Sequence, residues 1–228
     1  MERIRIAEFV HADETSMKVN GKNCWIWVFA SGKDVLIVVA DSRGKKVIEK
    51  TLGKNFKGII ICDGWKPYSS FTKRIQRCWA HILREVDELD EIYDEAKPFS
   101  QKLHSIFDDC KLLLEADPPP DKRKQIKKAM EARMRQAVSR EWKNDKMRKF
   151  AGKVMNGFDF WFTFVLHPYV EPTNNIAENA LRESVVQRKI IGTLRNEKGM
   201  FMHETAMSVI PTWENMGLNP HEELMKLL

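Results

Sequence analysis

The sequence predicts an α/β protein in which a mixed five-stranded sheet, flanked by helices, is interrupted by an all-helical insertion. The first 40 residues contain three apolar, strand-like runs joined by short polar turns. A fourth apolar run follows at 58–62, and from about residue 82 to 166 apolar residues recur at steps of three or four. We therefore divide the chain into a first core segment at 1–84, a helical insertion at 85–166 and C-terminal core helices at 167–228.

The first three strands should form a meander. One strand is expected around Ile6 to Val19, and the turn that follows contains Asn-Gly, the pair that commonly joins antiparallel strands. Cys24 to Ala30 forms the second run. The third, Val35 to Ala40, has the continuous Val and Ile content typical of a strand buried on both faces.

A crossover should lead to the fourth strand. The polar segment Lys45 to Lys54 suits this connection, and the fourth run ends at Asp63. Asp63 therefore lies at the C-terminal end of a strand, where open α/β sheets usually place ligands. The next segment, Gln76 to His81, fits either a short fifth strand or the lead-in to a helix from about Ile82.

The helical region carries two stripes of apolar residues, separated by the helix-breaking Asp-Pro-Pro-Pro-Asp segment at 117–121. The first stripe comprises Phe99, Leu103, Ile106, Cys110 and Leu113, and the second comprises Ile126, Met130, Met134, Val138 and Trp142. Residues 85–117 hold 11 acidic and 3 basic side chains, whereas 121–150 hold 12 basic and 4 acidic ones. We expect a helical hairpin whose acidic arm neutralises the basic arm.

Two further helices are expected near the C-terminal core. Phe158, Trp161, Phe162 and Val165 form one helical stripe, which closes at His167-Pro168. The segment 171–174 then resembles a helix start with Asn174 as the capping residue, and the helix that follows carries Glu178.

Composition sets the broad class of the protein. The net charge of +6 and pI near 9.1 are compatible with a polyanionic partner but do not demand one. The four cysteines contain no CxxC pair, which argues against a disulfide framework or a four-thiolate zinc site. The sequence has neither a run of 18 apolar residues nor a signal peptide at its start, so we expect a cytoplasmic protein without a membrane span.

Three acidic residues lie in three different kinds of local sequence. Asp13 is in the first strand, Asp63 ends the fourth, and Glu178 is inside a helix. Each alone has an ordinary explanation as a solvated strand residue, a turn residue or a surface charge. A ribonuclease-H-like sheet brings such positions together, where carboxylates repel one another unless a cation lies between them. Such a cluster can hold two Mg²⁺ ions about 4 Å apart for phosphodiester chemistry.

Several strings of residues, taken together, resemble the catalytic domain of the insertion-sequence family 66 transposases, over about residues 8 to 215. They are the segments 11–15, 62–65, 76–85, 171–182 and 185–189. The resemblance implies a DDE-type DNA transposase with a ribonuclease-H-like core, in which Asp13, Asp63 and Glu178 are the catalytic, metal-binding triad. Cys78-x-x-His81 looks like the C/D-x-x-H element of related transposases.

The resemblance also implies a mechanism and partners. Two Mg²⁺ ions per site, with Mn²⁺ as a substitute, would support cleavage by water to leave a 3′-hydroxyl, which then attacks a target phosphodiester. DNA is the implied partner, as transposon ends and as target, with a homo-oligomer in the DNA complex. Two other functions stay open: a stand-alone metal-dependent nuclease of the same fold, and a truncated, non-catalytic DNA-binding or assembly remnant.

Candidate DNA contacts lie around the triad. Asn175 and Arg182 share the helix face of Glu178, where Arg182 either pairs with Glu178 or contacts the scissile phosphate. A later basic set suits contacts to the DNA backbone, although a solvated loop is nearly as good an explanation. This set comprises Arg188, Lys189, Arg195 and Lys198. Trp65 could stack on an unpaired base, but we favour core packing. The resemblance places His81 near the site, and a structural hydrogen bond is the alternative.

The chain differs from its family in length. Members are typically much longer, with N-terminal regions thought to recognise DNA ends, whereas only twelve residues precede Asp13 here. We therefore expect an excised catalytic domain, a truncated element, or a relic that works with another protein. Recognition of specific transposon ends is accordingly not expected from this chain alone.

Overall fold

Strands β1 (Phe9–Val19) and β2 (Lys22–Ser31) form the predicted antiparallel hairpin, with His11 opposite Ala30. Asn20 and Gly21 between them have φ of 49° and 75°. These positive values are what a two-residue hairpin turn of the Asn-Gly kind requires. β3 (Asp34–Ala40) adds antiparallel to β2, which completes the meander.

The fourth strand introduces parallel pairing into the sheet. α2 (Lys45–Leu52) forms the crossover, and β4 (Ile59–Cys62) then runs parallel to β1. With the short β5 (Ile75–Arg77), the strand order is β3-β2-β1-β4-β5. This mixed five-stranded sheet confirms the predicted ribonuclease-H-like fold class. An additional strand, β6 (Thr193–Leu194), pairs with the end of β1 and is too short to leave a sequence pattern.

The computed structural model describes residues 1–227 and divides into two units. The first unit comprises Met1–Arg74 and the chain from Asn174 onward, and the second comprises Ile75–Thr173. The helical insertion expected at 85–166 lies within the second unit. Among the described residues no helix has the length and apolarity that a bilayer crossing needs.

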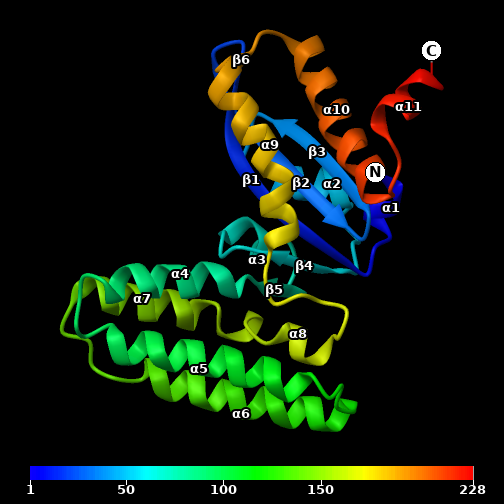
Figure 1. Cartoon of the computed structure of the whole chain (residues 1–228). Coiled ribbons are helices and arrows are strands. Elements are labelled where there is room, and N and C mark those ends of the chain that lie inside the picture. The colour runs from blue at the N-terminus through cyan, green and yellow to red at the C-terminus, as the bar shows by residue number, and fades with distance from the viewer. Residues whose placement is uncertain (228) are drawn as a thin grey trace. The chain divides into compact units, whose positions relative to one another are not determined.

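In the first unit, helices cover both faces of the sheet (Figure 1). α9 (Asn175–Ile191) and α10 (Glu197–Asn215) pack on the face that buries Met17, Val28 and Ile37. α2 and α3 (Lys66–Phe71) lie on the opposite face, where Tyr68 packs edge-on against Trp27. Two short helices, α1 (Glu2–Arg5) and α11 (Pro220–Met225), lie near the ends of the chain.

Side chains of α10 cover the free edge of β3. The backbone N–H groups of Val35, Ile37 and Val39 point away from β2 and donate to α10 instead. Their acceptors are the hydroxyls of Thr212 at 3.0 Å and Ser208 at 2.8 Å and the Glu204 carboxylate at 2.6 Å. An uncovered edge would be a template for pairing with another chain, so α10 both fills the core and closes the sheet.

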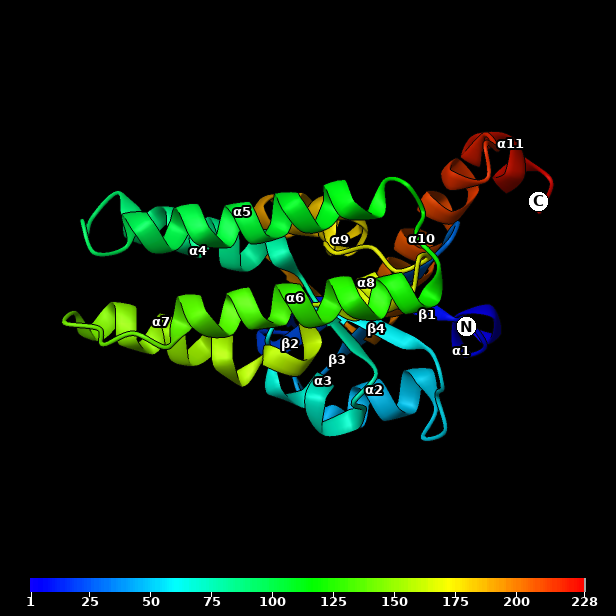
Figure 2. The ribbon, with the colours of Figure 1, turned by 90° about the horizontal axis from the view of Figure 1, so that it is seen from below.

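The second unit is helical after β5. It contains α4 (Trp79–Asp90), α5 (Lys97–Leu114), α6 (Pro120–Val138) and α7 (Asp145–Asn156), followed by the short η1 (Phe158–Phe160) and α8 (Thr163–Leu166). Figure 2 shows α5 and α6 lying side by side, as the predicted hairpin requires. Trp79 is fully buried, and its indole N–H donates to the Trp161 carbonyl at 2.7 Å.

Two details of the predicted helices are wrong. Trp142 lies beyond the end of α6 at Val138, and its indole N–H donates back to the Val138 carbonyl at 3.2 Å. The stripe at 158–165 forms two separate short helices instead of one, because Trp161 and Phe162 interrupt the helical hydrogen bonding. Apolar spacing alone cannot distinguish a helix from successive turns that bury the same side chains.

The acidic and basic arms of the hairpin do contact each other. Arg133 pairs with Asp109 at 2.7 Å, and Arg140 donates to the Glu95 carbonyl at 2.7 Å. Other basic residues pair with acids of their own helix, such as Lys127 with Glu131 at 3.2 Å. The charge of the basic arm is therefore partly neutralised within the second unit.

Candidate active site

Asp13 lies in the middle of β1, opposite Val28 of β2. Because side chains alternate along a strand and Val28 belongs to the core beneath α9 and α10, Asp13 points to the α9 face of the sheet. The carboxylate is partly buried, and its Oδ1 accepts a 2.8 Å hydrogen bond from the backbone N–H of Glu14. The strand thus fixes the orientation of this side chain.

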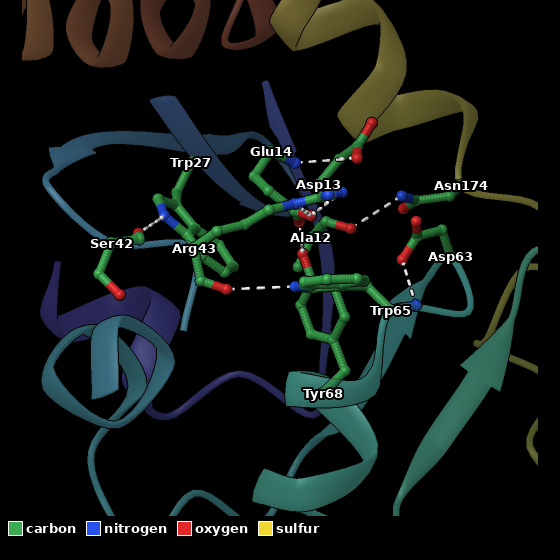
Figure 3. Close-up of polar contacts among 10 residues, drawn as sticks. All are labelled: Ala12, Asp13, Glu14, Trp27, Ser42, Arg43, Asp63, Trp65, Tyr68 and Asn174. Carbon is green, nitrogen blue, oxygen red and sulfur yellow. Dashed lines mark hydrogen bonds and ion pairs between the residues drawn. The ribbon is translucent and has the colours of Figure 1, made fainter. Parts of the chain in front are cut away.

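Asp63 follows the last residue of β4 and is held by a local turn. Its Oδ1 accepts a 2.8 Å hydrogen bond from the backbone N–H of Trp65, the arrangement of an Asx turn. Figure 3 shows the side chain where β4 ends, with the bond to the Trp65 N–H drawn. The carboxylate is partly buried, as that of Asp13 is.

Glu178 lies in the first turn of α9 and is also partly buried. A helix N-terminus carries a partial positive charge, which favours a carboxylate there. The third predicted acid is therefore positioned by a helix that packs directly on β1.

The three acids act on one another electrostatically. The pKa of Asp13 is raised to about 7, chiefly by burial; the hydrogen bond from the Glu14 N–H lowers it, and the charges of Glu14, Asp63 and Glu178 contribute smaller increases. A carboxylate in this setting gains from a nearby cation, because the cation offsets both burial and repulsion. Oxygen donors of this kind are those that Mg²⁺ and Ca²⁺ prefer, so the residues fit a hard divalent cation.

Asn174 joins the start of α9 to β1 in a way that the sequence did not predict. Asn174 is the N-cap residue of α9, as predicted, but its side chain makes no capping hydrogen bond to the helix. Instead, Nδ2 donates to the Ala12 carbonyl at 2.9 Å, and Oδ1 lies 3.2 Å from Nδ1 of His11. Burial lowers the pKa of His11 to about 4, so the ring is neutral at pH 7 and carries its proton on Nδ1.

A second carboxylate next to Asp13, that of Glu14, was not among the predicted site residues. The Glu14 side chain is fully buried on the opposite face of β1. Its Oε2 accepts a 2.5 Å hydrogen bond from the Tyr68 hydroxyl, and its Oε1 accepts 2.8 Å bonds from Nε and Nη2 of Arg43. Burial raises the pKa of Glu14, and these bonds oppose the shift. The alternation with Val10 and Ala12 was the sequence signal that Glu14 points inward.

Trp65 packs on Arg43 at the surface. It is 38% exposed, so the favoured expectation of core packing is wrong. The Arg43 guanidinium lies 4.1 Å from the centroid of the indole ring, and the indole N–H donates to the Arg43 carbonyl at 3.1 Å. The side chain remains accessible beside Asp63 (Figure 3).

The other predicted DNA contacts fall into different environments. Asn175, Arg182 and Lys189 are exposed on α9, and Arg195 is exposed after β6. Arg188 is partly buried, and its Nη1 donates to the Thr15 hydroxyl of β1 at 3.0 Å. In the second unit, Cys78 precedes α4 and His81 lies in the first turn of that helix.

A comparison with known protein families identifies the family of this chain. Residues 1–202 match the family described as "Transposase IS66 family". The chain belongs to this family.

A curated relative of this IS66 family chain is an uncharacterized protein, y4qI, from Sinorhizobium fredii (strain NBRC 101917 / NGR234). The two are 21% identical over 264 aligned residues, which include all of this chain and 48% of the relative. The chain thus spans about half the length of the curated relative it matches. No solved structure matches the chain.

Proposed function

We propose that the first unit is the catalytic core of an IS66 family transposase and that Asp13, Asp63 and Glu178 are its catalytic, metal-binding residues. One observation carries the proposal: three acids from distant segments are placed around one strand, because Asp13 lies in β1, β4 pairs in parallel with β1 and ends just before Asp63, and α9, which carries Glu178, packs on β1. The raised pKa of Asp13, to which the charges of Asp63 and Glu178 contribute, agrees with this placement. A purely structural role would not require three acids from distant segments at one place.

The residues around the acids orient them for a cation. Backbone N–H groups donate to Oδ1 of Asp13 and of Asp63, and in this proposal Oδ2 of each would be a ligand of the cation. Two Mg²⁺ ions, or Mn²⁺ in their place, would activate the attacking oxygen and stabilise the leaving one. In this proposal Asp13 contributes to both ions, Asp63 to one and Glu178 to the other, and the chemistry is DNA cleavage followed by strand transfer.

Basic residues of the first unit suit contacts to DNA phosphates. Arg182, Lys189 and Arg195 are exposed, and Asn175 lies one turn before Glu178. A cavity of about 960 Å³ in the same unit has four lysines in its lining, together with Asp41, Glu197 and several apolar residues; the lysines are Lys22, Lys46, Lys50 and Lys198. Phosphate contacts of this kind are independent of sequence, which fits a core that positions DNA without choosing it. The DNA-contact role of His81 and a homo-oligomeric DNA complex stay predictions.

Nicking and joining of transposon-end DNA tests the proposed function. The purified chain is incubated with the DNA in Mg²⁺, in Mn²⁺ or in EDTA, and the products are separated on a denaturing gel. Asp63→Asn should abolish both reactions and leave the fold intact, since it removes a charge without changing the packed volume. Asp34→Asn is the matched control, because Asp34 pairs with Arg3 at the start of β3, away from the triad.

Each result assigns a function. Joining that depends on the metal and on Asp63 supports a transposase. Cutting without joining supports a stand-alone nuclease, and binding without cutting supports a non-catalytic remnant. Equal rates for the wild type and Asp63→Asn would exclude the proposed triad.

A further inference from the structure

The two aspartates are held in the same way. Each Oδ1 accepts a 2.8 Å hydrogen bond from a backbone N–H, from Glu14 for Asp13 and from Trp65 for Asp63. The direction of each carboxylate therefore depends on a residue one or two positions further along the chain. A shift of Glu14 relative to Trp65 would therefore also shift the two carboxylates relative to each other.

The side chains of Glu14 and Trp65 both contact Arg43. The Arg43 guanidinium donates from Nε and Nη2 to the buried Glu14 carboxylate, at 2.8 Å for each bond. The same guanidinium lies 4.1 Å from the Trp65 ring centroid and 4.8 Å from that of Trp25. The Arg43 carbonyl also accepts the Trp65 indole N–H at 3.1 Å (Figure 3).

Arg43 belongs to neither strand that carries an aspartate. It lies between β3 and α2, so it connects the β1 residue beside Asp13 with the loop after β4 that holds Asp63. An arginine suits this position because its planar fork can bond a carboxylate and stack on an indole at the same time, whereas the compact ammonium of lysine cannot do both. The Glu14 side chain has no exposed surface, so the Arg43 guanidinium is bonded to a fully buried carboxylate on one side.

We propose that Arg43 is a positioning residue, which holds Asp13 and Asp63 in the relative placement that a shared divalent cation requires. This inference rests on the proposed function, because it assumes that the two aspartates bind the metal. Arg43 itself touches neither the metal nor the DNA in this proposal. Its effect reaches the site through Glu14 on one side and Trp65 on the other.

Mn²⁺ binding to the full chain tests this role. Isothermal titration with Mn²⁺ measures affinity directly, and the Mn²⁺ dependence of DNA nicking gives a second readout. For Arg43→Lys we expect about a tenfold loss of Mn²⁺ affinity, the lower end of the range for residues that orient metal ligands. Nicking should recover at high Mn²⁺, because the ligands themselves remain. Thermal unfolding should shift only slightly, since the positive charge is retained.

Arg140→Lys is a matched control in the second unit. The Arg140 guanidinium lies 4.0 Å from the Trp142 ring centroid and donates to the Glu95 carbonyl, and its side chain is 35% exposed, against 32% for Arg43. This substitution makes the same chemical change and should leave Mn²⁺ affinity unaltered. Trp65→Phe is a second test, because it keeps a smaller aromatic ring for the guanidinium and removes the indole N–H that donates to the Arg43 carbonyl. It should weaken Mn²⁺ binding by a smaller factor than Arg43→Lys.

The outcomes separate the inference from the proposed function. Wild-type Mn²⁺ affinity in Arg43→Lys, or an equal loss in Arg43→Lys and Arg140→Lys, overturns the positioning role. If Asp63→Asn loses Mn²⁺ binding in the same series, the metal site stands and only the role of Arg43 falls. If Asp63→Asn binds Mn²⁺ as the wild type does, or if the wild type binds none, the metal site falls and the inference falls with it.

Discussion

The Asn174 side chain donates a 2.9 Å hydrogen bond to the carbonyl of Ala12, the residue immediately before Asp13. The residue that begins α9 is therefore attached to the strand that carries the first acid. Glu178 follows one turn into the helix, and its backbone N–H donates to the Asn174 carbonyl at 3.1 Å. Asn174 thus sets the distance between the strand acid and the helix acid.

Asn174→Ala should lower both stability and activity. The substitution leaves the Ala12 carbonyl and His11 Nδ1 without their buried partner, which costs about 1–3 kcal/mol in the free energy of unfolding. Urea unfolding measures this change. Asn175→Ala, at the exposed next position, is the stability control and should change the value by less than about 0.5 kcal/mol. Equal effects of the two substitutions would contradict the proposed attachment.

Protonation of His11 should destabilise the protein in mild acid. Burial lowers its folded pKa to about 4 from the ordinary 6.5, so the unfolded chain binds more protons between these values. This contribution to stability is complete above about pH 6.5 and is lost as the pH falls toward 4. Urea unfolding at pH 5 and pH 7.5 checks this, with His11→Gln as the comparison. The raised pKa of Asp13 changes stability with pH in the opposite direction. The quantity to compare is therefore the difference in unfolding free energy between the wild type and His11→Gln at each pH.

Cation binding should release protons from the site. The pKa of Asp13 is raised to about 7, mainly by burial, so much of this carboxyl is protonated at pH 6 and must ionise to bind a metal. Mn²⁺ affinity should therefore fall as the pH drops below 7. Titrations at pH 6 in buffers with different ionisation enthalpies count the released protons. Asp13→Asn should bind weakly and release none. A wild-type titration without proton release would rule out Asp13 as the titrating ligand.

Substitutions of Arg188 and Lys189 should distinguish a structural role from a role in DNA binding. Arg188 donates to the Thr15 hydroxyl, so Arg188→Gln should reduce stability by about 1 kcal/mol. Lys189 is exposed, so Lys189→Gln should leave stability unchanged and reduce the slope of log K against log salt for DNA binding by about 0.9. Thermal unfolding and fluorescence anisotropy at several salt concentrations measure the two effects. Loss of stability in Lys189→Gln with an unchanged salt slope would reverse this assignment.

Much of the fold was predictable because its signals are local. The Asn20-Gly21 turn, the Val35 to Ala40 run and the proline break at 117–121 each depend on neighbouring residues. The predictions failed where packing between distant segments decides the outcome. Trp65 was expected in the core, but Arg43 holds it at the surface, and Asn174 was expected to cap a helix with its side chain, but that side chain bonds to β1.

The sequence by itself predicted the mixed sheet, the helical insertion and the three acids of the proposed triad, because periodicity, turn residues and motif strings are carried by short segments. Only the tertiary structure decided that the charges of Asp63 and Glu178 act on Asp13, and that Arg43 joins Glu14 to Trp65. These relationships connect residues far apart in the chain, and their strength depends on burial and distance, which no local pattern records.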